Sequence, residues 1–158
     1  MMKKLLTTRS LCVSAVIAAL YAAMTLLLPA ISYGELQCRL SESLTVLPIL
    51  FPQAIPGLFV GCLIANLLSP VGLVDIVFGS LATLLAAIGT WRLRRYPFLA
   101  CACPVLANGL IVGWMLGAFY GLPYWITMLQ VALGELGAVL IGCALLSALK
   151  RVDLSSLV

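Results

Sequence analysis

The chain has 158 residues, of which 64% are hydrophobic and 9% are charged, and its formal net charge is +4. Because a soluble domain carries about 25% charged residues, this composition excludes an ordinary soluble protein and predicts an all-α, polytopic membrane protein. Apolar segments fill almost the whole length. We therefore expect residues 1–158 to form a single integral membrane domain with no soluble domain beside it.

Six segments are expected to cross the membrane as helices. A helix needs about 20 apolar residues to span the hydrocarbon core; four segments reach that length, a fifth is just sufficient, and the remaining one is short and contains Pro48. In chain order the predicted spans are residues 9–28, 42–51, 53–69, 72–91, 97–120 and 123–149. Irregular backbone at membrane depth must be shielded by protein or line a water-filled cavity, so the short span, with Pro52 and Pro56 after it, indicates a cavity.

The basic residues give the predicted orientation. Eight of the nine lie in three clusters, and only Arg39 stands outside them: Lys3, Lys4 and Arg9; Arg92, Arg94 and Arg95; Lys150 and Arg151. Basic side chains collect on the cytoplasmic side of membrane proteins, and all three clusters share one side only if the short segment also crosses. We therefore expect six spans with both termini in the cytoplasm. Five spans with a re-entrant loop remain the alternative.

Small residues recur at every fourth position in four of the spans, a spacing that lets helices approach closely. In the first span, Ala15, Ala19 and Ala23 are bordered by other small residues, which predicts a smooth face that could slide against a partner protein. The other three ladders are expected to pack within the bundle: Gly57 and Gly61; Gly109, Gly113, Gly117 and Gly121; Gly134, Ala138 and Gly142.

Polar residues inside spans are candidates for function, since an acid at the centre of a membrane helix costs about 2.5 to 3.5 kcal/mol. On the predicted topology they converge on the outer half of the bundle, and the candidate ligand-binding residues are Gln37, Arg39, Glu42, Asn66, Asp75, Asn108, Gln130 and Glu135. Four acids share this half with a single base, Arg39; the acids are Glu35, Glu42, Asp75 and Glu135. Because buried charges must be paired, we expect a donor-rich ligand such as a cation. A plainer interpretation leaves Glu35 and Asp75 solvated in loops and pairs Arg39 with Glu42.

Aromatic residues gather at the same end of the predicted bundle: Tyr33, Phe119, Tyr120, Tyr124 and Trp125. Such rings anchor membrane helices at headgroup level, and we favour this interpretation. In the alternative, a planar heterocyclic ligand stacks on one or two of them, and Trp114 supplies a wall of the site.

Several functions are disfavoured by what the sequence lacks. It contains no G-x-x-x-x-G-K-[ST] phosphate-binding loop, so any ATP hydrolysis must be performed by another protein. Histidine is absent and the six cysteines form no C-x-x-C pair, so we expect no metal site. No nucleophile has a base at helical spacing. We therefore expect neither an enzyme nor a cofactor, and no nucleic-acid partner.

Three stretches resemble the queuosine-precursor S components (the QueT family) of energy-coupling factor (ECF) transporters. The most specific is I-S-Y-G-E-L-Q-C-R-L-S-E-S-L-T-V-L-P, from Ile31 to Pro48. The others are D-I-V-F-G-S-L-A-T-L-L, from Asp75 to Leu85, and L-Q-V-A-L-G-E-L, from Leu129 to Leu136. The similarity extends over nearly the whole chain.

The resemblance implies a six-helix S component in the cell membrane of a bacterium. Such a subunit captures a 7-deazaguanine, for example queuine or its aminomethyl precursor, from outside the cell. It also implies three protein partners, a transmembrane coupling protein and two ATPases, alongside the surrounding membrane lipid. In that superfamily an Ala-x-x-x-Ala face of the first helix contacts the coupling protein, which corresponds here to Ala15, Ala19 and Ala23.

Ligand chemistry suggests roles for the candidate residues. A guanine-like edge offers a ring N–H and an exocyclic amine side by side, and one carboxylate can accept both. We expect Glu135 to be this carboxylate and Asn108 or Gln130 to supply amide contacts, because an amide both donates and accepts. Glu42 or Asp75 then meets the side-chain amine, while Arg39 braces Glu42 or gates the first outer loop.

Three other functions remain open. The chain could be the S component for another cationic vitamin such as thiamine. It could be a stand-alone small secondary carrier or channel that oligomerises through its glycine ladders. A purely structural membrane subunit is the third possibility, but it leaves the convergence of acids and amides unexplained.

Overall fold

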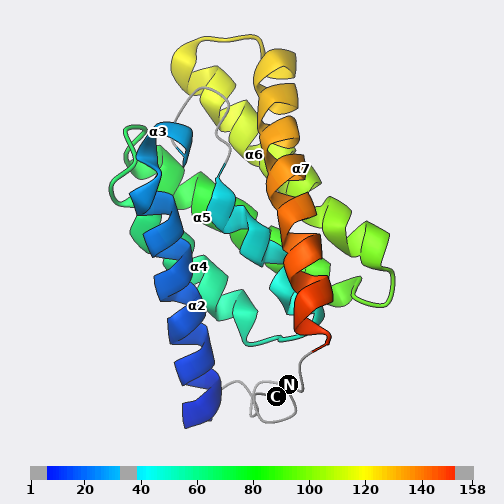
Figure 1. The fold of residues 1–158 in the computed structure, drawn as a ribbon. Helices are drawn as coiled ribbons and strands as arrows, with labels where there is room; N and C mark the ends of the chain where they lie inside the picture. The colour runs from blue at the N-terminus through cyan, green and yellow to red at the C-terminus, as the bar shows by residue number, and fades with distance from the viewer. Residues whose placement is uncertain (1–6, 33–38, 152–158) are drawn as a thin grey trace.

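The computed structural model of the chain describes residues 7–32 and 39–151 (Figure 1). Within these ranges every regular element is a helix, which confirms the predicted all-α membrane protein. Four helices are long and apolar enough to cross a membrane: α2 (Thr8–Leu27), α5 (Leu73–Arg92), α6 (Pro97–Tyr120) and α7 (Tyr124–Leu149). Three elements are shorter: α3 (Pro29–Ser32), the 3₁₀ helix η1 (Leu40–Ile49) and α4 (Ala54–Asn66).

Local sequence explains where the long helices begin and end. The side chain of Thr7 accepts a hydrogen bond from the backbone N–H of Ser10 and so caps the start of α2. Pro97 occupies the first position of α6, where its missing N–H is tolerated. Gly121 ends α6 in the left-handed conformation, with φ of 67°, which other residues adopt only at a cost.

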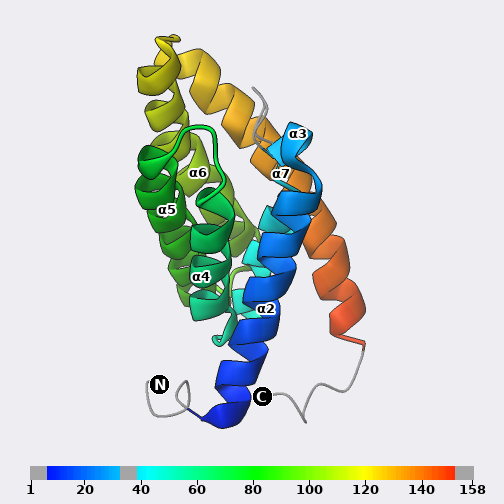
Figure 2. The same cartoon turned by 90° about the vertical axis from the view of Figure 1, so that its left-hand side faces the viewer.

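Successive helices run in alternating directions, as Figures 1 and 2 show. The start of α2, the turn between α5 and α6, and the end of α7 therefore lie at the same end of the bundle (Figure 1). The basic residues of these three places, from Arg9 to Arg151, gather there, and we call it the basic end. This agrees with the predicted grouping of the clusters; the crossing of six spans and the cytoplasmic side of the basic end stay predictions. Lys3 and Lys4 lie outside the described residues.

The 3₁₀ helix η1 lies at the centre of the bundle and contacts α2, α4, α5, α6 and α7. Every residue from Ser41 to Pro48 is buried. A 3₁₀ helix rises about 2.0 Å per residue against 1.5 Å in an α-helix, so ten residues extend about 20 Å rather than about 15 Å. The extended form lets a short segment reach deep into the bundle. Protein surrounds this proline-containing segment, and the cavity that the sequence predicted beside it is small, as described below.

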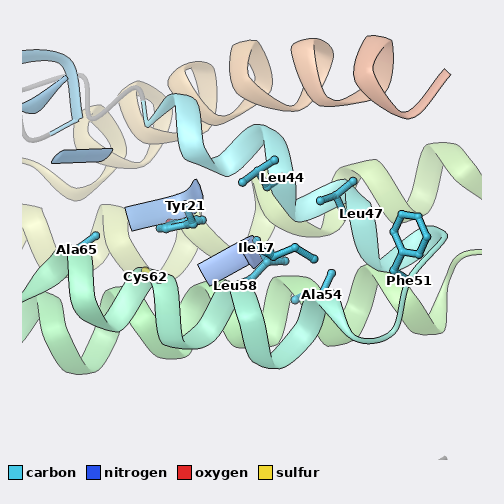
Figure 3. Close-up of a cluster of buried hydrophobic side chains, with 10 residues drawn as sticks. Ile17, Tyr21, Leu44, Leu47, Phe51, Ala54, Leu58, Cys62 and Ala65 are labelled. Atoms are coloured by element: carbon cyan, nitrogen blue, oxygen red, sulfur yellow. The ribbon is translucent and has the colours of Figure 1, made fainter. Parts of the chain in front are cut away.

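Helices α2 and α4 pack at very short range. A Cβ added to Gly57 would lie 2.6 Å from the backbone oxygen of Ser14, and one added to Gly61 would lie 2.7 Å from that of Ala18. Around this contact, side chains of α2, η1 and α4 pack against Tyr21 and Leu58, both fully buried (Figure 3). In contrast, Ala15, Ala19 and Ala23 of α2 are exposed on the outside of the bundle.

Small residues also set the packing of α7. A Cβ on Gly113 of α6 would lie 2.7 Å from the Cα of Met128, and a Cβ on Gly142 would collide with the backbone oxygen of Ser43 in η1. These close approaches confirm the packing role of the glycine ladders at most of their positions. Gly121 is an exception: a Cβ added there would meet nothing within 4 Å, and this residue ends α6 instead. The close approaches hold α6, α7 and η1 together, and these three elements supply the site described next.

Candidate functional site

A small cavity of about 10 Å³ lies between the start of η1 and the middle parts of α6 and α7. Four polar and two apolar side chains line it: Arg39, Glu42, Asn108, Glu135, Val112 and Val131. The residues from α6 and α7 come as pairs four positions apart, which places each pair on one face of its helix. The start of η1 lies towards the end of the bundle opposite the basic end (Figure 1).

Glu42 is held in place by hydroxyl groups from two other helices. Its Oε1 accepts hydrogen bonds from Tyr21 Oη and from Thr83 Oγ1, the latter at 3.0 Å. Tyr21 and Thr83 are fully buried, and Glu42 is 2% exposed. Its second oxygen, Oε2, is buried and has no hydrogen-bond partner among the described residues. One half of the carboxylate is thus fixed by the protein, and the other half remains available to accept.

Asn108 supplies a complementary group to the same cavity. The residue is 4% exposed, and its Nδ2 has no hydrogen-bond partner in the described part of the chain. A buried polar atom without a partner costs about 1 to 3 kcal/mol. The side chains of Asn108 and Glu42 are close enough to interact, but Asn108 Nδ2 and Glu42 Oε2 form no hydrogen bond of good geometry with each other. This donor and acceptor beside one cavity indicate a site for a polar ligand.

Arg39 connects the cavity to a second buried polar group. Its Nη2 donates to Asp75 Oδ2 at 2.7 Å, and Ser69 Oγ donates to the same oxygen at 2.6 Å. Asn66 Nδ2 donates to the backbone oxygen of Asp75 at 3.0 Å. Arg39, Asn66 and Asp75 are all buried. The network fixes the guanidinium at the rim of the cavity and neutralises Asp75.

The cavity lining carries a formal excess of one negative charge, because Glu42 and Glu135 face one guanidinium. That guanidinium already forms an ion pair with Asp75. Since a buried charge is stable only when it is paired or neutralised, the arrangement favours a ligand that brings positive charge or several N–H donors.

Comparison with known proteins identifies the family. The sequence profile of the QueT transporter family matches residues 11–151. The chain belongs to this family. A relative, the queuosine precursor transporter QueT of Lactococcus lactis subsp. cremoris (strain MG1363), is 32% identical in an alignment of length 157 that covers 89% of this chain and 92% of the relative. No solved structure matches the chain.

Membership of the QueT family confirms the resemblance seen in the sequence. It makes the chain a multi-pass protein of a family of membrane transporters, in agreement with its four long apolar helices. A bacterial cell membrane fits the source of the Lactococcus relative.

The structure brings together four of the eight predicted ligand-binding residues: Arg39, Glu42, Asn108 and Glu135. Asn66 and Asp75 lie behind Arg39 and do not line the cavity. Gln130 is half-buried and does not line it either. It lies five residues before Glu135, which places it about 140° away around the helix axis. Gln37 and Glu35 lie outside the described residues.

Three alternatives that the sequence left open differ from the structure. Asp75 is fully buried, so it is no solvated loop residue, and the 2.7 Å ion pair of Arg39 is with Asp75 instead of Glu42. Trp114 is 54% exposed and packs edge-on against Phe78, so it forms no wall of the cavity. The exposed rings of Phe119, Tyr120 and Trp125 agree with the favoured interfacial belt.

Sequence reasoning missed Tyr21 and Thr83, the residues that hold Glu42. A signal for Tyr21 existed, because Ser14, Tyr21 and Thr25 follow one another at helical spacing on the buried face of α2. Thr25 on this stripe donates to Ser41 Oγ at 2.7 Å. Thr83 had no comparable signal, since single threonines are common in membrane helices.

The cavity has room for about one water molecule, whereas small-molecule pockets measure about 300 to 1,000 Å³. A bicyclic ligand therefore fits only after α6, α7 or η1 moves outward. No group of three or more His, Cys, Asp or Glu side chains in the described ranges could hold a metal ion. The site is thus a compact set of charged and amide groups that must open to receive its ligand.

Proposed function

We propose that this chain binds a cationic 7-deazaguanine, such as queuine or its aminomethyl precursor, as the substrate-binding S component of an ECF importer. The convergence of Glu42, Asn108 and Glu135 on one cavity carries the proposal. The name of the Lactococcus relative supports the ligand class. Membership of a transporter family supports transport as the outcome of binding.

The three side chains match the hydrogen-bonding edge of a guanine-like base. Glu135 accepts from the ring N–H and the exocyclic amine, as a carboxylate does with the fork of an arginine. Asn108 Nδ2, which has no partner of its own in the described residues, donates to the neighbouring carbonyl oxygen. Glu42 then receives the side-chain ammonium on Oε2. Among the two acids considered for this role, only Glu42 lines the cavity.

Charge selects between related 7-deazaguanines. An alkylammonium group on the ligand would neutralise the formal excess of one negative charge in the lining. The corresponding nitrile is neutral and leaves Glu42 unpaired. Because a hydrogen bond to a charged group contributes about 1.5 to 3 kcal/mol, the amine should bind about 10- to 150-fold more tightly than the nitrile.

ATP-driven import requires partner proteins. The sequence contains no phosphate-binding loop, so we assign ATP hydrolysis to two separate ATPases and their coupling to a transmembrane protein. The exposed Ala15, Ala19 and Ala23 face of α2 supports a docking role, because small side chains let a partner helix approach closely. The basic end would then face the cytoplasm, and the ligand would enter from outside.

Binding to the purified protein tests the ligand assignment. Radiolabelled queuine should bind, unlabelled 7-deazaguanines should displace it, and thiamine should not. Glu135→Gln should weaken binding at least 10-fold, while Gln130→Ala on the same helix should leave it within twofold of the unchanged protein. Displacement by thiamine, or full binding by the Glu135→Gln protein, would contradict the assignment.

Reconstitution in liposomes tests the transport mechanism separately. The chain alone should bind its ligand without accumulating it, and uptake should require co-purified ATPases and ATP. Uptake by the chain alone would identify a stand-alone secondary carrier and would overturn the S-component assignment while leaving the ligand assignment intact.

A further inference from the structure

A second hollow of about 530 Å³ runs along the outer seam between α6 and α7, near the basic end. Its lining is almost entirely apolar: Pro97, Phe98, Cys101, Ala102, Val105, Leu106, Leu136, Val139, Leu140 and Cys143. We call it the seam groove. Val105 and Cys143 at its base pack with Val46 of η1 in one hydrophobic cluster, so the groove has a solid floor.

Small side chains between large ones give the groove its depth. Ala102 and the two cysteines leave space at the seam, where Cys101 Sγ lies 3.1 Å from Cys143 Sγ. Phe98, Leu106 and Leu140 flank this space and are 92%, 60% and 62% exposed. In a membrane protein such an exposed apolar surface faces lipid, so the hollow can take an acyl chain.

Basic residues border the groove at one end. Arg95 lies two residues before Pro97, the first residue of the lining, and Lys150 lies two turns beyond Cys143, the last. Because α6 and α7 are antiparallel and touch at Cys101 and Cys143, both basic side chains belong to the same end of the seam. Arg94, Arg95, Lys150 and Arg151 are all exposed.

No acidic side chain offsets this charge within residues 7–32 and 39–151. The three acids there, Glu42, Asp75 and Glu135, are all buried. Among these described residues, the basic end of the seam therefore presents only positive charge, directly beside an apolar groove. Basic pockets between membrane helices on the cytoplasmic side of a bilayer bind anionic lipid headgroups, and the basic end is predicted to lie on that side.

We infer that the seam groove binds one anionic phospholipid, with an acyl chain along α6 and α7 and its phosphate between Arg95 and Lys150. The apolar hollow and the adjacent positive charge together select this occupant. Arg9, at the start of α2, lies at the same end of the bundle but belongs to neither helix of the groove. Replacing Arg9 therefore distinguishes a specific site in the groove from a general electrostatic attraction of anionic lipid to the basic end.

Native mass spectrometry of the whole protein, released from bilayers that contain equal phosphatidylglycerol and phosphatidylcholine, tests the inference. The protein should retain one phosphatidylglycerol in preference to phosphatidylcholine. Arg95→Gln with Lys150→Gln should lower this retention about 30-fold, since each basic residue near the surface contributes about fivefold. Free inorganic phosphate should not compete, because it lacks the acyl chain.

Three further variants complete the test. Ala102→Trp should fill the groove and abolish retention, whereas Leu129→Trp, at an exposed position of α7 outside the groove, should have no effect. Arg9→Gln should retain lipid like the unchanged protein. Equal retention by the Arg95 and Lys150 double variant, an equal loss in Arg9→Gln, or a bound polypeptide in place of lipid would overturn the inference.

Discussion

The two halves of η1 are both largely buried but differ in chemistry. Residues 41–45 include Ser41, Glu42, Ser43 and Thr45, and they meet hydroxyl groups from other helices and the candidate cavity. Residues 46–49 are apolar, and Val46 and Leu47 pack into two hydrophobic clusters. Burial alone therefore does not identify the site. Polar atoms without partners distinguish the half that we assign to ligand binding from the half that stabilises the bundle.

The largest expected effect is on stability, from breaking the ion pair at the start of η1. Arg39→Gln leaves Asp75 buried without its cation, which should lower the free energy of unfolding by about 3 to 5 kcal/mol. Adding Asp75→Asn should recover much of this loss, because the uncompensated charge is removed. Thermal unfolding of both proteins in detergent measures the difference, and no recovery in the double variant would contradict the assigned pairing.

The apolar half should respond through stability alone. Leu47→Ala removes buried methyl groups and should lower the free energy of unfolding by about 2 to 5 kcal/mol. The affinity of the folded fraction for a 7-deazaguanine should stay within twofold of the unchanged protein, as determined by equilibrium binding at low temperature. A selective loss of affinity would place ligand contacts in this half as well.

The polar half should respond in the opposite way. Glu42→Gln keeps the shape of the side chain but removes the charge offered to the ligand ammonium, so affinity for queuine should fall about 10- to 150-fold. Affinity for the neutral nitrile should change much less. Titration of both ligands measures this contrast, and equal losses for both would assign Glu42 to the base instead of the amine.

The smallest effect is expected one step away from the cavity. Tyr21→Phe removes one of the two hydroxyl donors that hold Glu42 Oε1. Affinity for queuine should fall about 2- to 12-fold, equivalent to about 0.5 to 1.5 kcal/mol, because Thr83 still holds Glu42 Oε1 and Tyr21 does not itself contact the ligand. Thr25→Val, which removes a hydroxyl on the same face of α2 that binds Ser41 instead, is the matched control. An equal loss in both proteins would indicate a general effect of α2.

The sequence was sufficient to predict the long helices and two acids of the cavity, Glu42 and Glu135. It overestimated the negative charge of the site, because four acids were expected there and Asp75 instead pairs with Arg39 outside the lining. An apolar run of about 20 residues is long enough to span a bilayer. A carboxylate inside the membrane is costly, so Glu42 and Glu135 were candidates for function. The face of the helix on which a polar residue lies was harder to predict. Depth in the membrane selected Gln130 and Glu135 alike, but the two side chains lie on different faces of α7 and only Glu135 lines the cavity. Pairing was harder still, because Arg39 and Asp75 lie 36 residues apart in the chain.

A structure of the protein with bound queuine tests the central claim most directly. We predict a cavity widened between η1, α6 and α7, with Glu135 and Asn108 on the guanine-like edge and Glu42 Oε2 on the ammonium. A ligand bound elsewhere, with Glu42, Asn108 and Glu135 making no contact to it, would contradict the account.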